Sequence, residues 1–182
     1  MKIACIGWGS LVWNPGVLRC RGEWQLDGPV LPLEFARTSK DGRLTLVLTE
    51  AAAAVPSLWV ELDYADPRTA KDALRGREGT GPLSIGLWPG PAPRYKVGVA
   101  EIATWAQGKG LDAVVWTALP PKFANTDGQA PHSPDAAVAY LKGLDADAAA
   151  KAREYVQRAP AQIRTRFRTV FEVQLGWRLA NP

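Results

Sequence analysis

The stretch that decides the fold is Lys2-Ile3-Ala4-Cys5-Ile6, which leads directly into Gly7-Trp8-Gly9-Ser10-Leu11. The apolar, β-prone run predicts a buried first strand. The strand ends at two glycines that flank an aromatic residue, and glycine lets a backbone approach a ligand closely. Successive N–H groups in such a turn can hold an anion. The sequence therefore predicts a strand followed by a loop that binds a small molecule. The alternative is a tight turn with no binding or catalytic role.

This loop does not follow the pattern of a nucleotide-binding loop. The third glycine of a Rossmann fingerprint would fall at Val12, where a helix should begin. Residues 14–16 are instead Asn-Pro-Gly, which is typical of a turn. No glycine-rich run leads into Lys followed by Ser or Thr, as a P-loop requires. We therefore expect no nucleotide cofactor.

The composition is that of an ordinary globular protein. The chain has 182 residues, of which 47% are hydrophobic and 22% charged, and its formal net charge is +4. This length suffices for one domain with a substantial core. No apolar run approaches the roughly 20 residues of a membrane helix, and the first residues lack the apolar core of a signal peptide. We therefore expect a cytoplasmic protein without a membrane partner.

Strands dominate the first two-thirds of the chain. We predict them at residues 29–38, 43–49, 58–64, 95–105 and 113–118, with a hairpin turn at Asp41-Gly42. Because the first of these contains Pro32, that strand should lie at an edge or carry a bulge. Residues 66–79 read as a helix that begins at Asp-Pro and ends at Gly. Residues 81–94 and 120–131 are predicted loops.

The end of the chain is predicted to be helical. Helices are expected at residues 133–144 and 146–157, and another on the apolar stripe within residues 163–171. This segregation favours an α+β fold, with a mixed, largely antiparallel, barrel-like sheet and flanking helices. No repeat or linker divides the chain. We therefore expect a single domain over residues 1–182, with a core at 1–120 and a helical extension, 130–182, packed on it.

The main catalytic candidate is Glu78, in the last turn of the helix at residues 66–79. A carboxylate there faces the negative end of the helix dipole, which costs up to about 1 kcal/mol and favours the protonated form. A carboxyl group of this kind suits a general acid or base. The alternative is an exposed side chain paired with Arg75 or Arg77.

Two other pairs of side chains carry weaker indications. Ser10 and the sole histidine, His132, resemble a nucleophile pair, but Ser10 does not lie in a Gly-x-Ser-x-Gly elbow. Glu61 and Asp63 share one strand face, where a metal site is conceivable and solvated polarity is the simpler interpretation. We expect no metal ion.

The cysteines and late arginines also have ordinary explanations. Cys5 suits a buried strand, whereas Cys20 has an arginine on each side that could lower its pKa. Arginines at 153, 158, 164, 166 and 168 could form an anion or nucleic-acid patch. A solvated helix face is the more common arrangement, and we expect no nucleic-acid partner.

The chain resembles the γ-glutamylcyclotransferase-like superfamily in four stretches taken in order. These are residues 7–11, residues 35–45 (Phe-Ala-Arg-Thr-Ser followed by Arg-Leu-Thr), the strand at 58–62, and the helix end at 74–78. The resemblance implies a γ-glutamyl amine or peptide as substrate and 5-oxoproline as product, without a cofactor. It makes Glu78 the catalytic residue. The implied substrate-binding residues are Gly7, Trp8, Gly9, Ser10, Leu11 and Arg43.

Overall fold

The computed structural model describes residues 1–123, 126–127 and 129–179, and the chain divides into two compact units. Unit 1 comprises residues 1–31 and 56–119, and unit 2 comprises residues 32–55 and 120–182. Each unit is therefore built from two separate segments of the chain. The single domain expected from the sequence stays a prediction, which an unfolding experiment described below tests.

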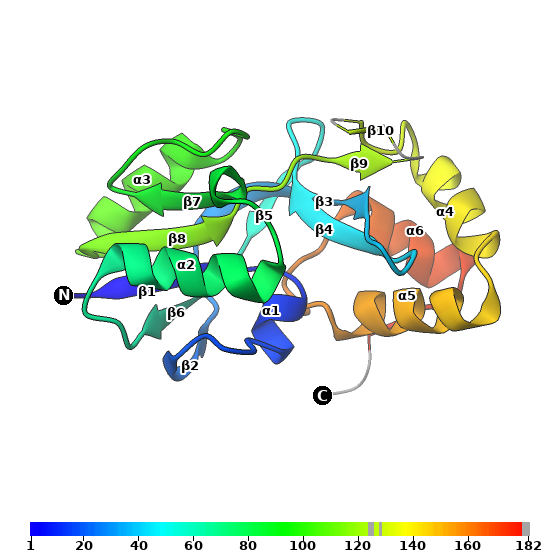
Figure 1. Cartoon of the computed structure of the whole chain (residues 1–182). Helices are drawn as coiled ribbons and strands as arrows, with labels where there is room; N and C mark the ends of the chain where they lie inside the picture. The colour runs from blue at the N-terminus through cyan, green and yellow to red at the C-terminus, as the bar shows by residue number, and fades with distance from the viewer. Residues whose placement is uncertain (124–125, 128, 180–182) are drawn as a thin grey trace. The chain divides into compact units, whose positions relative to one another are not determined.

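Unit 1 is a five-stranded mixed sheet in the order β2-β6-β1-β8-β7 (Figure 1). Its strands are β1 (Ile3–Gly7), β2 (Cys20–Gln25), β6 (Leu58–Leu62), β7 (Ile85–Trp88) and β8 (Ala113–Thr117). β1 lies in the centre, antiparallel to β6 and parallel to β8. All five residues of β1 are buried, so both faces of the sheet are covered at its centre. The predicted first strand is thus confirmed.

Helix α2 (Pro67–Glu78) packs against β7 and β8. Asp66 caps its first turn by accepting a hydrogen bond from Thr69 N, and Pro67 occupies the first helical position. Gly79 ends the helix in the left-handed conformation, with φ of 59°. Ala70 and Leu74 face the sheet and join a core that includes Ile3, Cys5 and other buried side chains. These caps fix where the helix ends, and so where Glu78 lies.

Two predictions for unit 1 are wrong. Residues 95–105 were predicted to be a strand, but α3 (Val99–Gly108) occupies most of them, with Ile102 and Ala106 buried one turn apart. Residues 81–94 were predicted to be a loop, but they contain a short 3-10 helix, η1 (Pro82–Ser84), and the edge strand β7. β7 forms beside β8 because Gly86 leaves room for the Trp116 ring, from which a Cβ would lie only 2.1 Å away.

Unit 2 has a second mixed sheet with three helices gathered against it (Figure 1). Its strands are β3 (Val30–Thr38), β4 (Leu44–Leu48), β5 (Ala54–Pro56), β9 (Lys122–Phe123) and β10 (Thr126–Asp127). β3 pairs with β4 through the predicted hairpin, whose Gly42 has φ of 82°, and a register shift interrupts the pairing between Phe35 and Arg37. The expected irregularity in this strand is therefore confirmed. The two short strands β9 and β10 fall in the predicted loop at 120–131.

The helices of unit 2 are α4 (Pro134–Lys142), α5 (Ala146–Arg158) and α6 (Arg166–Gln174). α4 and α5 lie where the sequence predicts helices, whereas α6 begins at Arg166 behind a Thr165 cap. The Phe35 ring meets the rings of Tyr155 and Phe171 edge-on, at centroid distances of 6.3 and 5.5 Å. This aromatic group joins β3 to α5 and α6.

The α+β class and the mixed strand pairing are confirmed. The strands form two sheets, however, and among the described residues neither sheet closes into a barrel. None of the described helices has the length and apolar character needed to cross a bilayer.

Candidate functional site

The loop after β1 begins at a position that only glycine fits. A Cβ on Gly7 would lie 2.6 and 2.7 Å from two atoms of the Trp24 ring. The glycine is therefore required by close packing rather than by a positive φ. Gly9, with φ of −134° and ψ of −141°, precedes the single-turn helix α1 (Ser10–Trp13) at its N-cap position. Close approach of the backbone to a side chain thus explains the first glycine of the loop.

The five loop residues differ in what they present. Trp8 and Leu11 are buried, and Leu11 belongs to the core of unit 1. The Ser10 side chain is half-buried, and its hydroxyl accepts a hydrogen bond from Arg77 Nη2 at 3.2 Å. Ser10 therefore meets the end of α2 through Arg77.

Arg77 joins three parts of unit 1 through its guanidinium. Its Nη1 donates to Glu78 Oε1 at 2.6 Å, and its Nη2 donates to Ser10 Oγ. Nε and Nη2 also donate to the carbonyl of Asn14, at 3.2 and 2.7 Å. Asn14 is the residue that ends α1. The loop and the helix end therefore share one polar group, in which Arg77 is the common partner.

This group is shielded from water. The side chains of Arg77 and Glu78 are 13% and 16% exposed. Ion pairs at this depth are screened less than surface pairs. Cys5 is fully buried, and this burial holds the pKa of its thiol well above the ordinary value; Cys20 and Glu78 add to the effect. Glu78 is thus shielded and pairs with Arg77, one of the two partners that the alternative interpretation offers, whereas Arg75 pairs with Asp72.

Arg43 is not part of this group. It belongs to unit 2, where its Nε donates to Asp41 Oδ1 at 2.9 Å and its guanidinium lies 5.6 Å from the centre of the Tyr155 ring. Burial would raise the pKa of Asp41, but hydrogen bonds from Ser39 and Arg43 hold it below the ordinary value. The contacts of Arg43 therefore stabilise the β3–β4 hairpin.

The weaker candidates have structural partners. Arg21 forms ion pairs with both Glu61 and Asp63, so these carboxylates are held by a cation of the chain itself. In the described ranges no three His, Cys, Asp or Glu side chains gather as a metal site would require. His132 is exposed and belongs to unit 2, whereas Ser10 belongs to unit 1.

The lowered pKa that the flanking arginines could give Cys20 is not found. Burial raises its pKa. The two neighbouring arginines do not offset this effect because both are engaged elsewhere. Arg19 lies over the Tyr64 ring, 4.4 Å from its centre, and Arg21 binds the carboxylates of β6 and the residue after it.

Neither the solvated helix face that the sequence favours nor the alternative arginine patch holds for Arg168. Its side chain is 1% exposed and donates to the carbonyls of four residues around the end of α5. Burial lowers the pKa of Arg168 to about 10, so the guanidinium is charged at neutral pH. This arginine has a structural role within unit 2.

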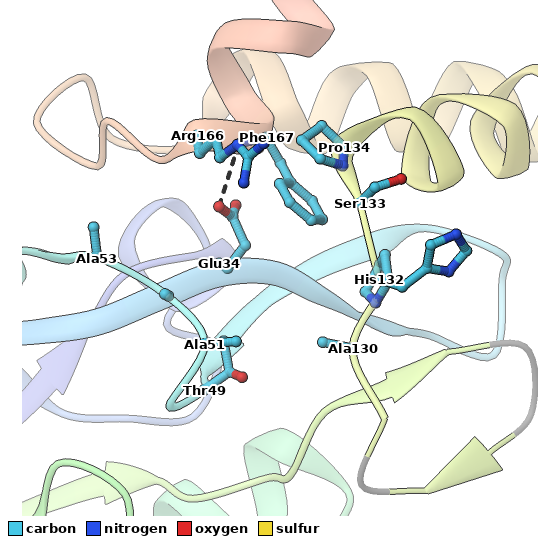
Figure 2. Close-up of a pocket in the computed structure, with 12 residues that line it drawn as sticks. Glu34, Thr49, Ala51, Ala53, Ala130, His132, Ser133, Pro134, Arg166 and Phe167 are labelled. Carbon is cyan, nitrogen blue, oxygen red and sulfur yellow. Dashed lines mark hydrogen bonds between the residues drawn. The ribbon is translucent and has the colours of Figure 1, made fainter.

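A cavity in unit 2 was not predicted from the sequence. Its volume is about 330 Å³, and Figure 2 shows Glu34 on its wall, directed at the start of α6. Glu34 accepts hydrogen bonds from Phe35 N at 2.9 Å and from Phe167 N at 3.2 Å, and burial raises its pKa. A charged residue within the otherwise apolar run of β3 is the sequence feature that indicates a buried carboxyl group of this kind. Because the bond from Phe167 N satisfies a first-turn N–H of α6, we assign Glu34 a structural role.

Comparison with models of known protein families, with curated proteins and with solved structures finds no match for this chain. The functional argument therefore rests on the polar group at the end of α2.

Proposed function

We propose that this protein is a γ-glutamylcyclotransferase-like enzyme that converts a γ-glutamyl amine or peptide into 5-oxoproline and the free amine. One observation carries the proposal. Arg77 binds both the Ser10 hydroxyl and the Glu78 carboxylate, and these two side chains come from the two stretches that the family resemblance pairs in one site. On this proposal, residues 1–120 form the core of a γ-glutamylcyclotransferase-like fold.

The proposed reaction is an intramolecular aminolysis. The α-amine of the γ-glutamyl group attacks its own γ-carbonyl, which forms the C–N bond of the lactam and then breaks the C–N bond to the leaving amine. Glu78 takes the proton of the attacking amine and returns it to the leaving nitrogen, so no proton is gained or lost overall. The N–H groups of residues 9–11 hold the substrate carboxylate or the developing oxyanion. Folding the substrate for ring closure supplies much of the rate enhancement.

The ion pair between Arg77 and Glu78 also suits a second candidate. A carboxylate held by an arginine can serve structure alone, and the loop would then bind a small anion without turnover. Such a domain would bind 5-oxoproline or a γ-glutamyl compound and release no product.

One experiment separates these two functions. The full chain is incubated with γ-glutamylalanine, γ-glutamylethylamine and glutathione, and 5-oxoproline is measured by mass spectrometry. We expect release by the wild type and none by Glu78→Gln, which preserves the size of the side chain. Glu154→Gln is the matched control, because Glu154 is an exposed residue of α5 paired with Arg158. Ser10→Ala should weaken substrate binding, measured as a higher KM, and should have little effect on the melting temperature.

The possible results have distinct meanings. Undiminished release by Glu78→Gln would exclude the catalytic role of Glu78. Binding of 5-oxoproline in calorimetry without any release by the wild type would favour the anion-binding domain. The absence of both binding and release with all three compounds would contradict the proposed function.

A further inference from the structure

Arg77 has more partners than an ion pair with Glu78 requires. Its guanidinium donates to a carboxylate, a hydroxyl and a backbone carbonyl, which come from the end of α2 and from the two ends of α1. Arginine can do this because its donors lie in a fixed planar fork, whereas a lysine ammonium is a single point charge. The arrangement therefore fixes the distance between the loop and the helix end.

The local backbone also fits around this side chain. Gly16 adopts a φ of 60°, and a Cβ at that position would lie 3.3 Å from Arg77 Cγ. The turn after α1 thus passes along the aliphatic part of the arginine. Neighbouring residues of a helix do not usually face each other. Arg77 and Glu78 meet at 2.6 Å where α2 gives way to Gly79.

We propose that Arg77 is a positioning residue that fixes the Glu78 carboxylate beside the Ser10 loop. This inference rests on the proposed cyclotransferase function. Arg77 binds Oε1 of Glu78, which leaves Oε2 to take the proton of the substrate amine. Arg77 thus acts through Glu78 and need not touch the substrate.

The test compares three variants of the full chain. Arg77→Gln removes the charge and most of the contacts, and Arg77→Lys keeps the charge but cannot reach all three partners. Arg75→Gln is the matched control, because Arg75 lies on the same helix, is exposed and pairs with Asp72. With γ-glutamylalanine we expect Arg77→Gln to lose about 10- to 100-fold in kcat with a smaller change in KM.

The split between kcat and KM distinguishes positioning from a general structural effect. Arg77→Lys keeps the charge but loses the planar fork of donors, so it should recover only part of the lost kcat. A kcat that falls no further in Arg77→Gln than in Arg75→Gln, or a KM that rises as much as kcat falls, would overturn the inference while leaving the role of Glu78 intact.

Hydrogen exchange tests the same contacts without turnover. The amides of residues 9–14 should exchange faster in Arg77→Gln than in the wild type and in Arg75→Gln. If the wild type released no 5-oxoproline, the proposed function would fail, and this exchange measurement would still decide the positioning role. Unchanged exchange would overturn it.

Discussion

Arg168 allows the most direct test of how unit 2 is held together. Its guanidinium donates to the carbonyls of Val156, Ala159, Pro160 and Ile163, at 3.2, 2.7, 2.7 and 3.0 Å. The first two carbonyls lie at the end of α5, where the last turn of any helix leaves carbonyls without internal partners. A cation at this end also interacts favourably with the helix dipole. We predict that Arg168→Met destabilises unit 2 strongly.

The magnitude follows from what the substitution leaves behind. Methionine fills the space of the aliphatic part of the arginine side chain but donates no hydrogen bond. The buried carbonyls that accept from Arg168 therefore lose this donor. A hydrogen bond to a charged group contributes about 1.5–3 kcal/mol, and removing one member of a buried charged network costs about 3–5 kcal/mol. The free energy of unfolding should therefore fall by about 3–4 kcal/mol, out of the roughly 5–15 kcal/mol of a typical protein. Arg168→Lys should recover less than half of the loss.

The assay is urea unfolding followed by two signals. Far-ultraviolet circular dichroism reports the helices, whereas seven of the eight tryptophans lie in unit 1 and only Trp177 in unit 2. Coincident shifts of both transitions would support the single domain predicted from the sequence. Arg164→Met is the control, because Arg164 is 54% exposed and pairs with Glu172 at the surface. A loss below about 1 kcal/mol in Arg168→Met, or one equal to that of Arg164→Met, would refute the reasoning.

Two further predictions concern pH and helix ends. Burial raises the pKa of Glu34, so the folded chain binds the Glu34 proton more tightly than the unfolded chain does. The free energy of unfolding should therefore fall as the pH rises from about 4.5 through the raised pKa of the folded chain. Glu34→Gln lacks this component, so the stability of the wild type relative to this variant should decrease over that range in urea titrations; a constant difference would contradict the assignment. Gly79→Ala should cost about 1 kcal/mol because φ is 59° there, whereas Gly76→Ala, inside α2, should stabilise by about 0.5–1 kcal/mol. Thermal unfolding measures both changes in stability. Equal shifts of the melting temperature in Gly79→Ala and Gly76→Ala would contradict the argument from backbone conformation.

The features predicted correctly from the sequence are those that local chemistry determines. The caps Asp66 and Gly79 fixed the ends of α2, and Ser133 fixed the start of α4. Asp41-Gly42 placed the β3–β4 hairpin. In each case a few adjacent residues satisfy backbone groups or permit one backbone conformation, so no distant contact is needed.

Features that depend on distant contacts were missed. β7 exists because Gly86 admits the ring of Trp116 from a strand about 30 residues later. α3 was mistaken for a strand because its start alternates apolar and small residues, while the spacing of Ile102 and Ala106 is helical. For the candidate site, the sequence indicated Ser10 and Glu78 and offered Arg77 as a partner of Glu78, but it did not indicate that Arg77 also binds Ser10. Tertiary packing determines each of these.

The boundaries between the two units coincide with prolines in the sequence. The chain passes between the units three times, and each crossing falls at a proline: Pro32, Pro56 and Pro120. Proline lacks the N–H that a strand ladder requires and keeps the preceding residue extended, so a boundary between units can fall there without a flexible segment. A search for polar or glycine-rich linkers therefore finds no boundary. Pro32 lies within β3, where the sequence predicts local irregularity, and the same residue marks a boundary between the two units.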